Sequence, residues 1–183
     1  DQYLAAFGGI TCLDLAPDGR VKVTPLDVSI STVEEFRNSV LLFYTGVTRS
    51  ANDILAAQKT DTERNHAAVV DSLHRTKELG YQIKETLEAG DIERFGRLLD
   101  LHWENKKRRS GQISDHRLDR WYQLAKENGA LGGKIMGAGG GGFFMFCCIN
   151  GRKACLRQVL TAEGLREMPY DFDFEGAKVV VNF

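Results

Sequence analysis

The chain has 183 residues, a formal net charge of -1 at pH 7 and 43% hydrophobic residues, so it is large enough for one domain, or one domain and part of another, with a true core. The near-zero charge disfavours a bulk electrostatic grip on nucleic acid or an anionic membrane, and no apolar stretch approaches the roughly 20 residues of a membrane helix. The four cysteines form no CxxC pair and no metal-like grouping with the four histidines, so we expect reduced, buried thiols in a cytoplasmic protein.

The chain opens like the middle of a structured protein. No charged region, apolar region or cleavage site of a leader peptide precedes residues 1–9, so we expect the C-terminal part of a longer protein. Residues 1–7 predict a short helix, broken by two glycines. Residues 10–16 and 20–28 predict two strands of a hairpin. Ser31 and Glu34 have the S-x-x-E spacing of a capping box, which predicts a helix from there to about Asn38.

Residues 40–44, VLLFY, predict a buried central strand. Helices are expected over 51–58, from Asp61 to Gly90, from an Asp91 cap onwards, over 114–128 and over 151–164. Residues 165–169 and 177–181 predict two more strands, the last one buried. The fold class is therefore α+β, with a mostly antiparallel sheet covered by a layer of helices.

The most unusual stretch is residues 134–149, KIMGAGGGGFFMFCCI. Gly137, Ala138, Gly139, Gly140, Gly141 and Gly142 carry almost no Cβ bulk, so their amides are able to close on an anion, and we expect a phosphate. A mere flexible hairpin tip remains the alternative. We expect a valine at Gly140 to reduce turnover and leave the fold intact.

The same loop fits GxGxxG, but a dinucleotide-binding loop must open a helix, and here a β-prone apolar run follows. An oxidoreductase would require a helix directly after Gly142. A P-loop is disfavoured because no Lys-Ser or Lys-Thr closes the loop, and the VAIK, HRD and DFG motifs of protein kinases are missing.

Residues 132–143, GGKIMGAGGGGF, resemble the third conserved motif of the GHMP kinases, the family named for galactokinase, homoserine kinase, mevalonate kinase and phosphomevalonate kinase. The segment Asp1-Gln2-Tyr3, followed by Gly8-Gly9, is similar to the segment that holds the catalytic aspartate in the family's sugar kinases. Residues 41–50, together with His102, Trp103 and Lys106, are most similar to the branch that acts on D-glycero-D-manno-heptose 7-phosphate. The resemblance covers essentially the whole chain.

This resemblance implies a division of the chain into residues 1–30, the end of an N-terminal nucleotide-binding domain, and residues 31–183, the GHMP kinase C-terminal domain. It implies transfer of the γ-phosphoryl group of ATP to a hydroxyl of a sugar phosphate, with Mg²⁺ held mainly by residues of the missing N-terminal half. No metal ligand is assigned in this chain, which by itself is expected to be inactive. Neither nucleic acid nor a membrane is an expected partner, and the oligomeric state stays open.

The resemblance places Asp1 at the position of the catalytic base and residues 137–142 in the phosphate loop. Arg49, in a strand-to-helix loop, is a candidate for the acceptor's phosphate. Lys106, one turn beyond His102, is a second candidate, and the basic residues that follow it are expected to be solvated. Lys134 would face phosphates or extend from a sheet edge into solvent. We expect His102, Trp103 and Trp121 to be packing residues.

Two other functions stay open. One is a noncatalytic phosphate- or nucleotide-binding module, including a pseudokinase that kept the glycine loop and lost the chemistry. The other is a GHMP kinase for another sugar, such as galactose or fucose.

Overall fold

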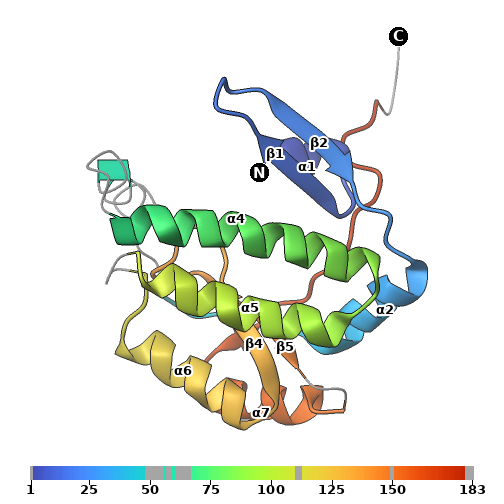
Figure 1. The fold of residues 1–183 in the computed structure, drawn as a ribbon. Helices are drawn as coiled ribbons and strands as arrows, with labels where there is room; N and C mark the ends of the chain where they lie inside the picture. Colours follow the sequence, from blue (N-terminus) through green and yellow to red (C-terminus); the bar gives the residue numbers. More distant parts are fainter. Residues whose placement is uncertain are drawn as a thin grey trace.

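A computed structural model describes residues 2–47, 56, 59–60, 67–109, 113–148 and 151–179. Its smaller part consists of α1 (Gln2–Phe7) and the hairpin of β1 (Thr11–Leu15) and β2 (Val21–Pro25). Its larger part is a four-stranded sheet with helices, and the hairpin lies over α4 (Ala67–Glu88) of that part (Figure 1). The expected N-terminal helix and antiparallel hairpin are confirmed.

The sheet has the order β4-β5-β3-β6, and each neighbouring pair is antiparallel. Its strands are β3 (Val40–Tyr44), β4 (Ala130–Ile135), β5 (Phe143–Cys148) and the short β6 (Arg166–Glu167). The expected central strand over residues 40–44 and the mostly antiparallel α+β fold are therefore confirmed.

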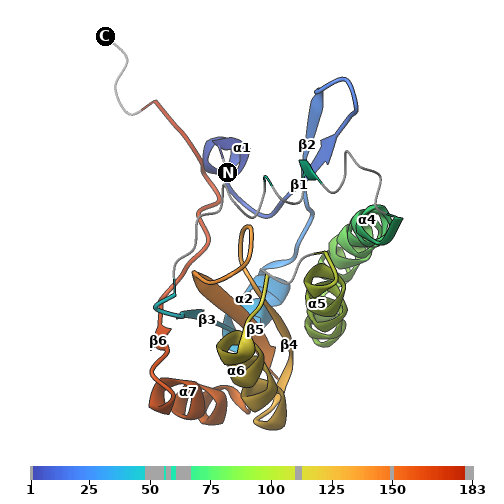
Figure 2. The same ribbon diagram turned by 90° about the vertical axis from the view of Figure 1, so that its left-hand side faces the viewer.

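The two faces of the sheet pack against different sets of helices. Phe144, Phe146 and Cys148 of β5 pack with α6 (His116–Glu127), α7 (Lys153–Ala162) and Trp103, whereas Cys147 packs with the first half of α5 (Ile92–Lys107), the helix that also carries Trp103. Figure 2 shows α4 and α5 side by side next to β4, with α6 and α7 at the end of the sheet far from the hairpin. Side chains alternate between the faces of a strand, so one apolar strand serves both cores.

Helix α5 lies unusually close to β4. A Cβ added at Gly132 of β4 would come within 2.2 Å of the carbonyl oxygen of Gly96 in α5. Only glycine permits this approach of backbone to backbone. The contact fixes α5 against the strand that leads into the glycine loop.

Two helix starts differ from the sequence expectation. The helix α2 (Ile30–Ser39) is capped by Ser29, whose Oγ accepts a hydrogen bond from the amide of Thr32 at 3.1 Å. The capping box predicted at Ser31 is therefore wrong, because the extended residue is Ser29 and Ser31 already lies inside the helix. Asp115 caps α6, whereas the predicted Asp91 cap of α5 is confirmed. The helix expected over 51–58 and the expected helix start at Asp61 lie outside the described residues, apart from Ala56.

The C-terminal tail, residues 168–179, returns from the sheet to α1 (Figure 2). The amide of Gly9 donates to the carbonyl of Asp173 at 2.6 Å, and the amide of Ala177 donates to the carbonyl of Ala6 at 3.1 Å. The strand predicted over 177–181 is wrong for its described residues 177–179, because they follow α1 rather than the sheet and Val179 is 81% exposed. Instead of adding a strand, the tail joins the two parts of the fold.

Candidate functional site

The glycine loop, Met136–Gly142, joins β4 to β5. Its order of strand, loop and strand is the predicted one, and β5 begins directly at Phe143. The helix that an oxidoreductase of the GxGxxG type requires after Gly142 is therefore absent at this described position. Five glycines of the loop have a positive φ, from 70° at Gly137 to 142° at Gly141, a conformation that other residues rarely adopt.

Backbone hydrogen bonds from two neighbouring segments hold the loop. The amide of Gly140 donates to the carbonyl of Ile113 at 2.8 Å, and the amide of Gly142 donates to the carbonyl of Val47 at 2.7 Å. The carbonyl of Gly142 in turn accepts from the amide and the hydroxyl of Thr45, each at 2.9 Å. Two of the amides that the sequence offered to an anion are thus used within the chain.

The remaining amides are those of Gly137, Ala138, Gly139 and Gly141, which donate no backbone hydrogen bond to any described residue. Gly137 is exposed, and a Cβ built on it meets no atom within 4 Å. A Cβ on Gly141 would lie 2.4 Å from the carbonyl oxygen of Val47. The loop therefore has an open side at Gly137 and an anchored side at Gly141.

A group of basic side chains lies beside the loop, from α5, from β4 and from the residues just after α5. Lys106 is only 5% exposed, and its Nζ donates to the carbonyl oxygens of Gly137 at 2.6 Å and Ile135 at 3.4 Å. Arg109 donates from Nε to Ser72 Oγ at 3.0 Å and from its terminal nitrogen to Thr76 Oγ1. The expectation that every basic residue after Lys106 is solvated is wrong for Arg109, because α4 packs against it.

The basic group has no negative partner among the described residues. The pKa of Lys106 is lowered to about 8, first by burial and then by the positive charges of Lys134 and Arg109. Burial is also the main cause of the lowered pKa of Lys134, with Arg109 adding to it. The side chains that shift one another's pKa here are those of His102, Lys106, Arg109 and Lys134, and no carboxylate is among them. A strongly positive potential therefore lies next to the glycine loop.

His102 belongs to the same group. Its pKa is lowered to about 3, first by burial and then by the positive charges of Lys134, Lys106 and Arg109. Its Nδ1 is buried without a hydrogen-bond partner in the described part of the chain. The imidazole is neutral at pH 7. Although we expected a packing residue, it therefore also lies at the edge of a charged site.

The structure brings some of the candidate residues together and leaves others aside. It places Lys106, Lys134 and residues 137–142 in one region, while Asp1 and Arg49 lie outside the described residues. Trp103 is fully buried and Trp121 packs against the same core, as expected. Sequence reasoning missed Arg109, although its spacing of seven residues from His102 and three from Lys106 is that of one helix face and could have grouped it with them.

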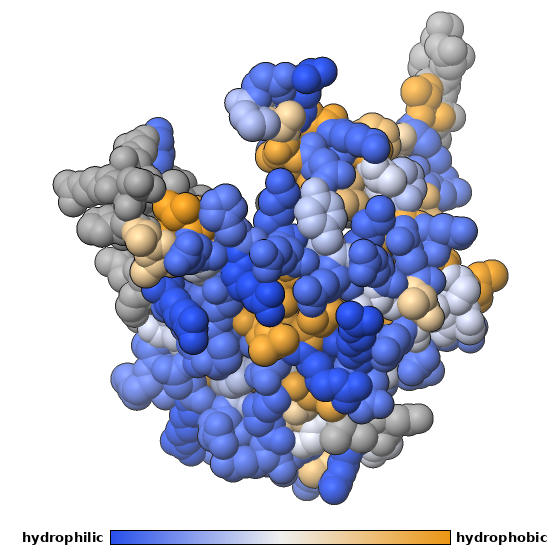
Figure 3. Space-filling view, in the orientation of Figure 1, coloured by the Kyte–Doolittle hydropathy of each residue, from blue (hydrophilic) through white to orange (hydrophobic). Residues whose placement is uncertain are grey.

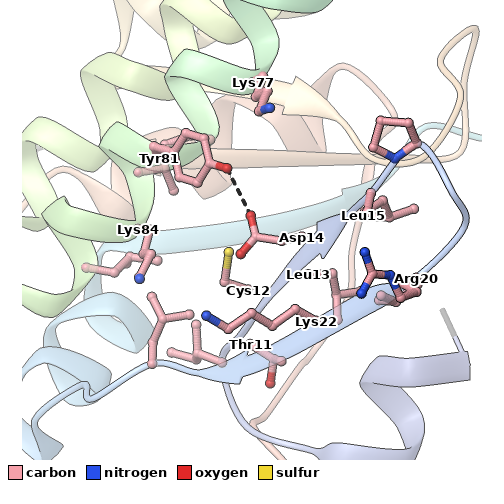
Figure 4. A pocket seen from close by; sticks show the side chains of 18 residues that line it. Thr11, Cys12, Leu13, Asp14, Leu15, Arg20, Lys22, Lys77, Tyr81 and Lys84 are labelled. Atoms are coloured by element: carbon pink, nitrogen blue, oxygen red, sulfur yellow. Dashed lines mark hydrogen bonds between the residues drawn. The ribbon is translucent and has the colours of Figure 1, made fainter.

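Apart from the glycine loop, the structure has a cavity of about 1050 Å³ between the hairpin and α4. Figure 4 shows Tyr81 donating to Asp14 Oδ1 across it, at 3.0 Å, with Lys22, Lys77 and Lys84 nearby. None of the loop residues lines it. The face drawn in Figure 3 is mostly hydrophilic, with apolar surface around the hairpin and in the middle of the face.

The described residues contain no group of three or more His, Cys, Asp or Glu side chains that could hold a metal ion. Among the helices they form, none has the length and apolar character required to cross a membrane.

The loop, the antiparallel sheet and the helical layer have the fold of a GHMP kinase C-terminal domain. Residues 83–154 match the family described as GHMP kinases C terminal. The resemblance found in the sequence is thereby confirmed.

The individual relatives are sugar kinases. The chain is 33% identical over 178 residues to the D-glycero-alpha-D-manno-heptose 7-phosphate kinase of Campylobacter jejuni, covering 97% of this chain and 52% of that protein. It is 30% identical over 166 residues to the L-fucokinase/L-fucose-1-P guanylyltransferase of Bacteroides fragilis, covering 88% and 17%. The crystal structure of a D-glycero-D-manno-heptose 1-phosphate kinase from Bacteroides thetaiotaomicron superposes with a TM-score of 0.69 at 27% identity, covering 99% and 49%. The chain thus spans about half the length of the heptose kinases that it matches.

Proposed function

We propose that the protein is part of an ATP-dependent kinase that transfers the γ-phosphoryl group to a hydroxyl of D-glycero-D-manno-heptose 7-phosphate. The observation that carries this proposal is the similarity to a heptose 7-phosphate kinase along 97% of the chain. The glycine loop and the basic side chains beside it support the same class of reaction, because kinases act mainly by positioning their substrates and neutralising charge.

Each part of the site has a proposed role in that reaction. The acceptor hydroxyl attacks the γ-phosphorus of ATP, the bond from that phosphorus to the bridging oxygen breaks, and ADP leaves. Asp1 is proposed to accept the proton of the hydroxyl, and Arg49 to bind the acceptor's phosphate. The amides on the open side of residues 137–142 are proposed to receive phosphate oxygens of the nucleotide.

Magnesium enters this proposal with ATP. The magnesium ligands are proposed to lie mainly in an N-terminal half, as the family resemblance implies, and none is assigned in this chain. Residues 1–30 are proposed to complete the domain that contains that half, and residues 31–183 to form the C-terminal domain. The proposed location is the cytoplasm.

The test is an acceptor panel with the protein at its full natural length, ATP and magnesium. D-glycero-D-manno-heptose 7-phosphate, galactose and fucose are supplied separately, and ADP release is measured. We expect release with the heptose phosphate, and its loss in Asp1→Asn with a much smaller change in sugar binding. Arg49→Ala should raise KM for the sugar phosphate more than KM for ATP.

A second candidate is a kinase for an unphosphorylated sugar, which the fucokinase relative favours. Release of ADP with fucose or galactose, and none with the heptose phosphate, would establish it. If ATP binds and none of the acceptors causes ADP release, the protein is a noncatalytic nucleotide-binding module.

A further inference from the structure

The basic group beside the glycine loop holds three charges that form no ion pair with any described residue. Lys106, Arg109 and Lys134 come from the end of α5, the turn after it and β4. The groups that face them are the hydroxyls of Ser72 and Thr76 from α4 and the carbonyls of Ile135 and Gly137. Within the described chain, every hydrogen-bond acceptor of these cations is thus neutral.

Nearby lysines show how this fold treats a structural cation. Lys126 at the end of α6 also reaches a carbonyl of β4, that of Leu131 at 2.7 Å, but it pairs with Asp100 at 3.0 Å as well. Lys107, adjacent to Lys106 in the chain, pairs with Glu104 at 2.8 Å. Each of these charges has a carboxylate within reach, whereas none of the three cations beside the loop has one in the described residues.

Three neighbouring positive charges without a negative partner destabilise the folded state. A buried charge is destabilising unless it is paired, and like charges at close range repel each other. His102 adds no negative charge, and its buried Nδ1 also lacks a partner within the described residues. An anion that the described residues do not supply would stabilise this arrangement.

The donors that remain suit a group with several oxygens and more than one negative charge. Arg109 uses two of the five N–H donors of a guanidinium for Ser72 and Thr76, and the other three have no hydrogen-bond partner among the described residues. Lys134 Nζ has no hydrogen-bond partner in the part of the chain that the structure describes. Arginine and lysine together are the usual receptors of phosphate groups, the first as a planar fork and the second as a point charge.

We propose that Lys106, Arg109 and Lys134 form a binding site for a phosphate group, separate from the amides of the glycine loop and adjacent to them. Lys106 connects the two, because it holds the carbonyl of Gly137. Both substrates of the proposed reaction carry phosphate, namely the acceptor and ATP. If the acceptor's phosphate is the occupant, this site selects a phosphorylated sugar over a neutral one, and that assignment rests on the proposed function.

The first experiment uses inorganic phosphate as the probe and needs no turnover. Isothermal titration of the full chain should show binding in the millimolar range, and Lys134→Met should weaken it about ten- to a hundredfold, the effect of losing one hydrogen bond to a charged group. Lys107→Met is the matched control, since it removes one positive charge from the same surface region and should leave binding unchanged. Lys134 is the preferred variant because no side-chain hydrogen bond or ion pair within the described fold is lost with it. Arg109→Met provides a second variant.

The second experiment identifies the source of the phosphate. With the protein at its full natural length, Lys134→Met should raise KM for the heptose phosphate if the acceptor is the occupant, or KM for ATP if the nucleotide is. If Lys134→Met and Arg109→Met bind inorganic phosphate as tightly as the wild type, or if the wild type does not bind it, the site does not exist, even if the kinase is active. If inorganic phosphate binds and Lys134→Met weakens this binding, but no acceptor is phosphorylated, the phosphate site is confirmed and the proposed kinase function is wrong.

Discussion

Adding a single methyl group at three positions separates the functional side of the glycine loop from its anchored side. Gly137 has φ 70° and open space where a Cβ would go. Gly137→Ala therefore costs only the left-handed backbone strain, about 1–2 kcal/mol. Gly164, after α7, has φ 89° and the same open space, so Gly164→Ala is a control with equal strain in a place where no substrate is expected.

Gly141→Ala adds a clash to the strain. Its Cβ would lie 2.4 Å from the carbonyl oxygen of Val47, which accepts the hydrogen bond of Gly142. Relieving the clash lengthens that bond, so we expect a total cost of about 2–3 kcal/mol. In a domain of this size 1 kcal/mol corresponds to about 2–4 °C in Tm. Thermal unfolding should therefore show similar decreases in Tm for Gly137→Ala and Gly164→Ala and a larger decrease for Gly141→Ala.

Activity should follow a different order. A methyl group at Gly137 stands at the open side of the loop, where a phosphate oxygen would approach the amides, so kcat/KM for ATP should fall about ten- to a hundredfold, the loss of one hydrogen bond to a charged group. Gly164→Ala should leave it within about twofold of the wild type. Equal activities of the two variants would refute the phosphate-loop assignment. The expectation that a valine at Gly140 leaves the fold intact is not supported, because Gly140 is buried, has φ 74° and donates to a carbonyl.

Three further predictions concern pH, the tail and the thiols. His102 has a pKa of about 3 in the folded protein, against 6.5 for the free side chain, so the unfolded state takes up this proton first as pH falls. Between pH 7 and pH 5 the free energy of unfolding should therefore fall by about 2 kcal/mol in the wild type and not in His102→Gln. Denaturant unfolding at the two pH values checks this, and the variant His116→Gln, at an exposed position, should behave as the wild type. Gly176→Ala, whose Cβ would lie 2.5 Å from a carbonyl oxygen of α1, should speed hydrogen exchange in α1, unlike Gly164→Ala, and unchanged exchange would mean that the tail does not hold that helix. Burial raises the pKa of the Cys147 thiol to about 12, so mass spectrometry should find Cys147 unmodified by iodoacetamide at pH 8 until the protein is unfolded in urea; rapid labelling in the folded protein would contradict its place in the core.

Local signals in the sequence predicted most of the elements. The Asp91 cap and the apolar face of α5 depend on residues within one or two turns, so their pattern can be read directly. The glycine loop was predicted between two strands because no helical pattern follows Gly142. The start of α2 was placed at the wrong serine, since both Ser29 and Ser31 fit a cap and only the backbone conformation distinguishes them.

Contacts between distant segments were beyond a single sequence. The anchors of the loop are carbonyls of Val47 and Ile113, far from it in the chain and without any side-chain signature. The charge of Arg109 looked solvated because a basic helix end is favourable by itself. Its packing against Ser72 and Thr76 depends on the antiparallel approach of α4, which the local pattern does not encode.

Lys106 links the loop and the basic group, because it contacts the one and is repelled by the charges of the other. Its ammonium group binds the carbonyl of Gly137, the residue at the open side of the loop, while the charges of Lys134 and Arg109 act on the same ammonium. An anion bound by Lys134 and Arg109 would offset the repulsion on Lys106 and strengthen its charged form, and with it the bond to Gly137. Occupation of the basic group should therefore hold the loop in the conformation seen here. If one substrate fills the basic group and the other the loop, they should bind with positive cooperativity, because each favours the arrangement that the other requires.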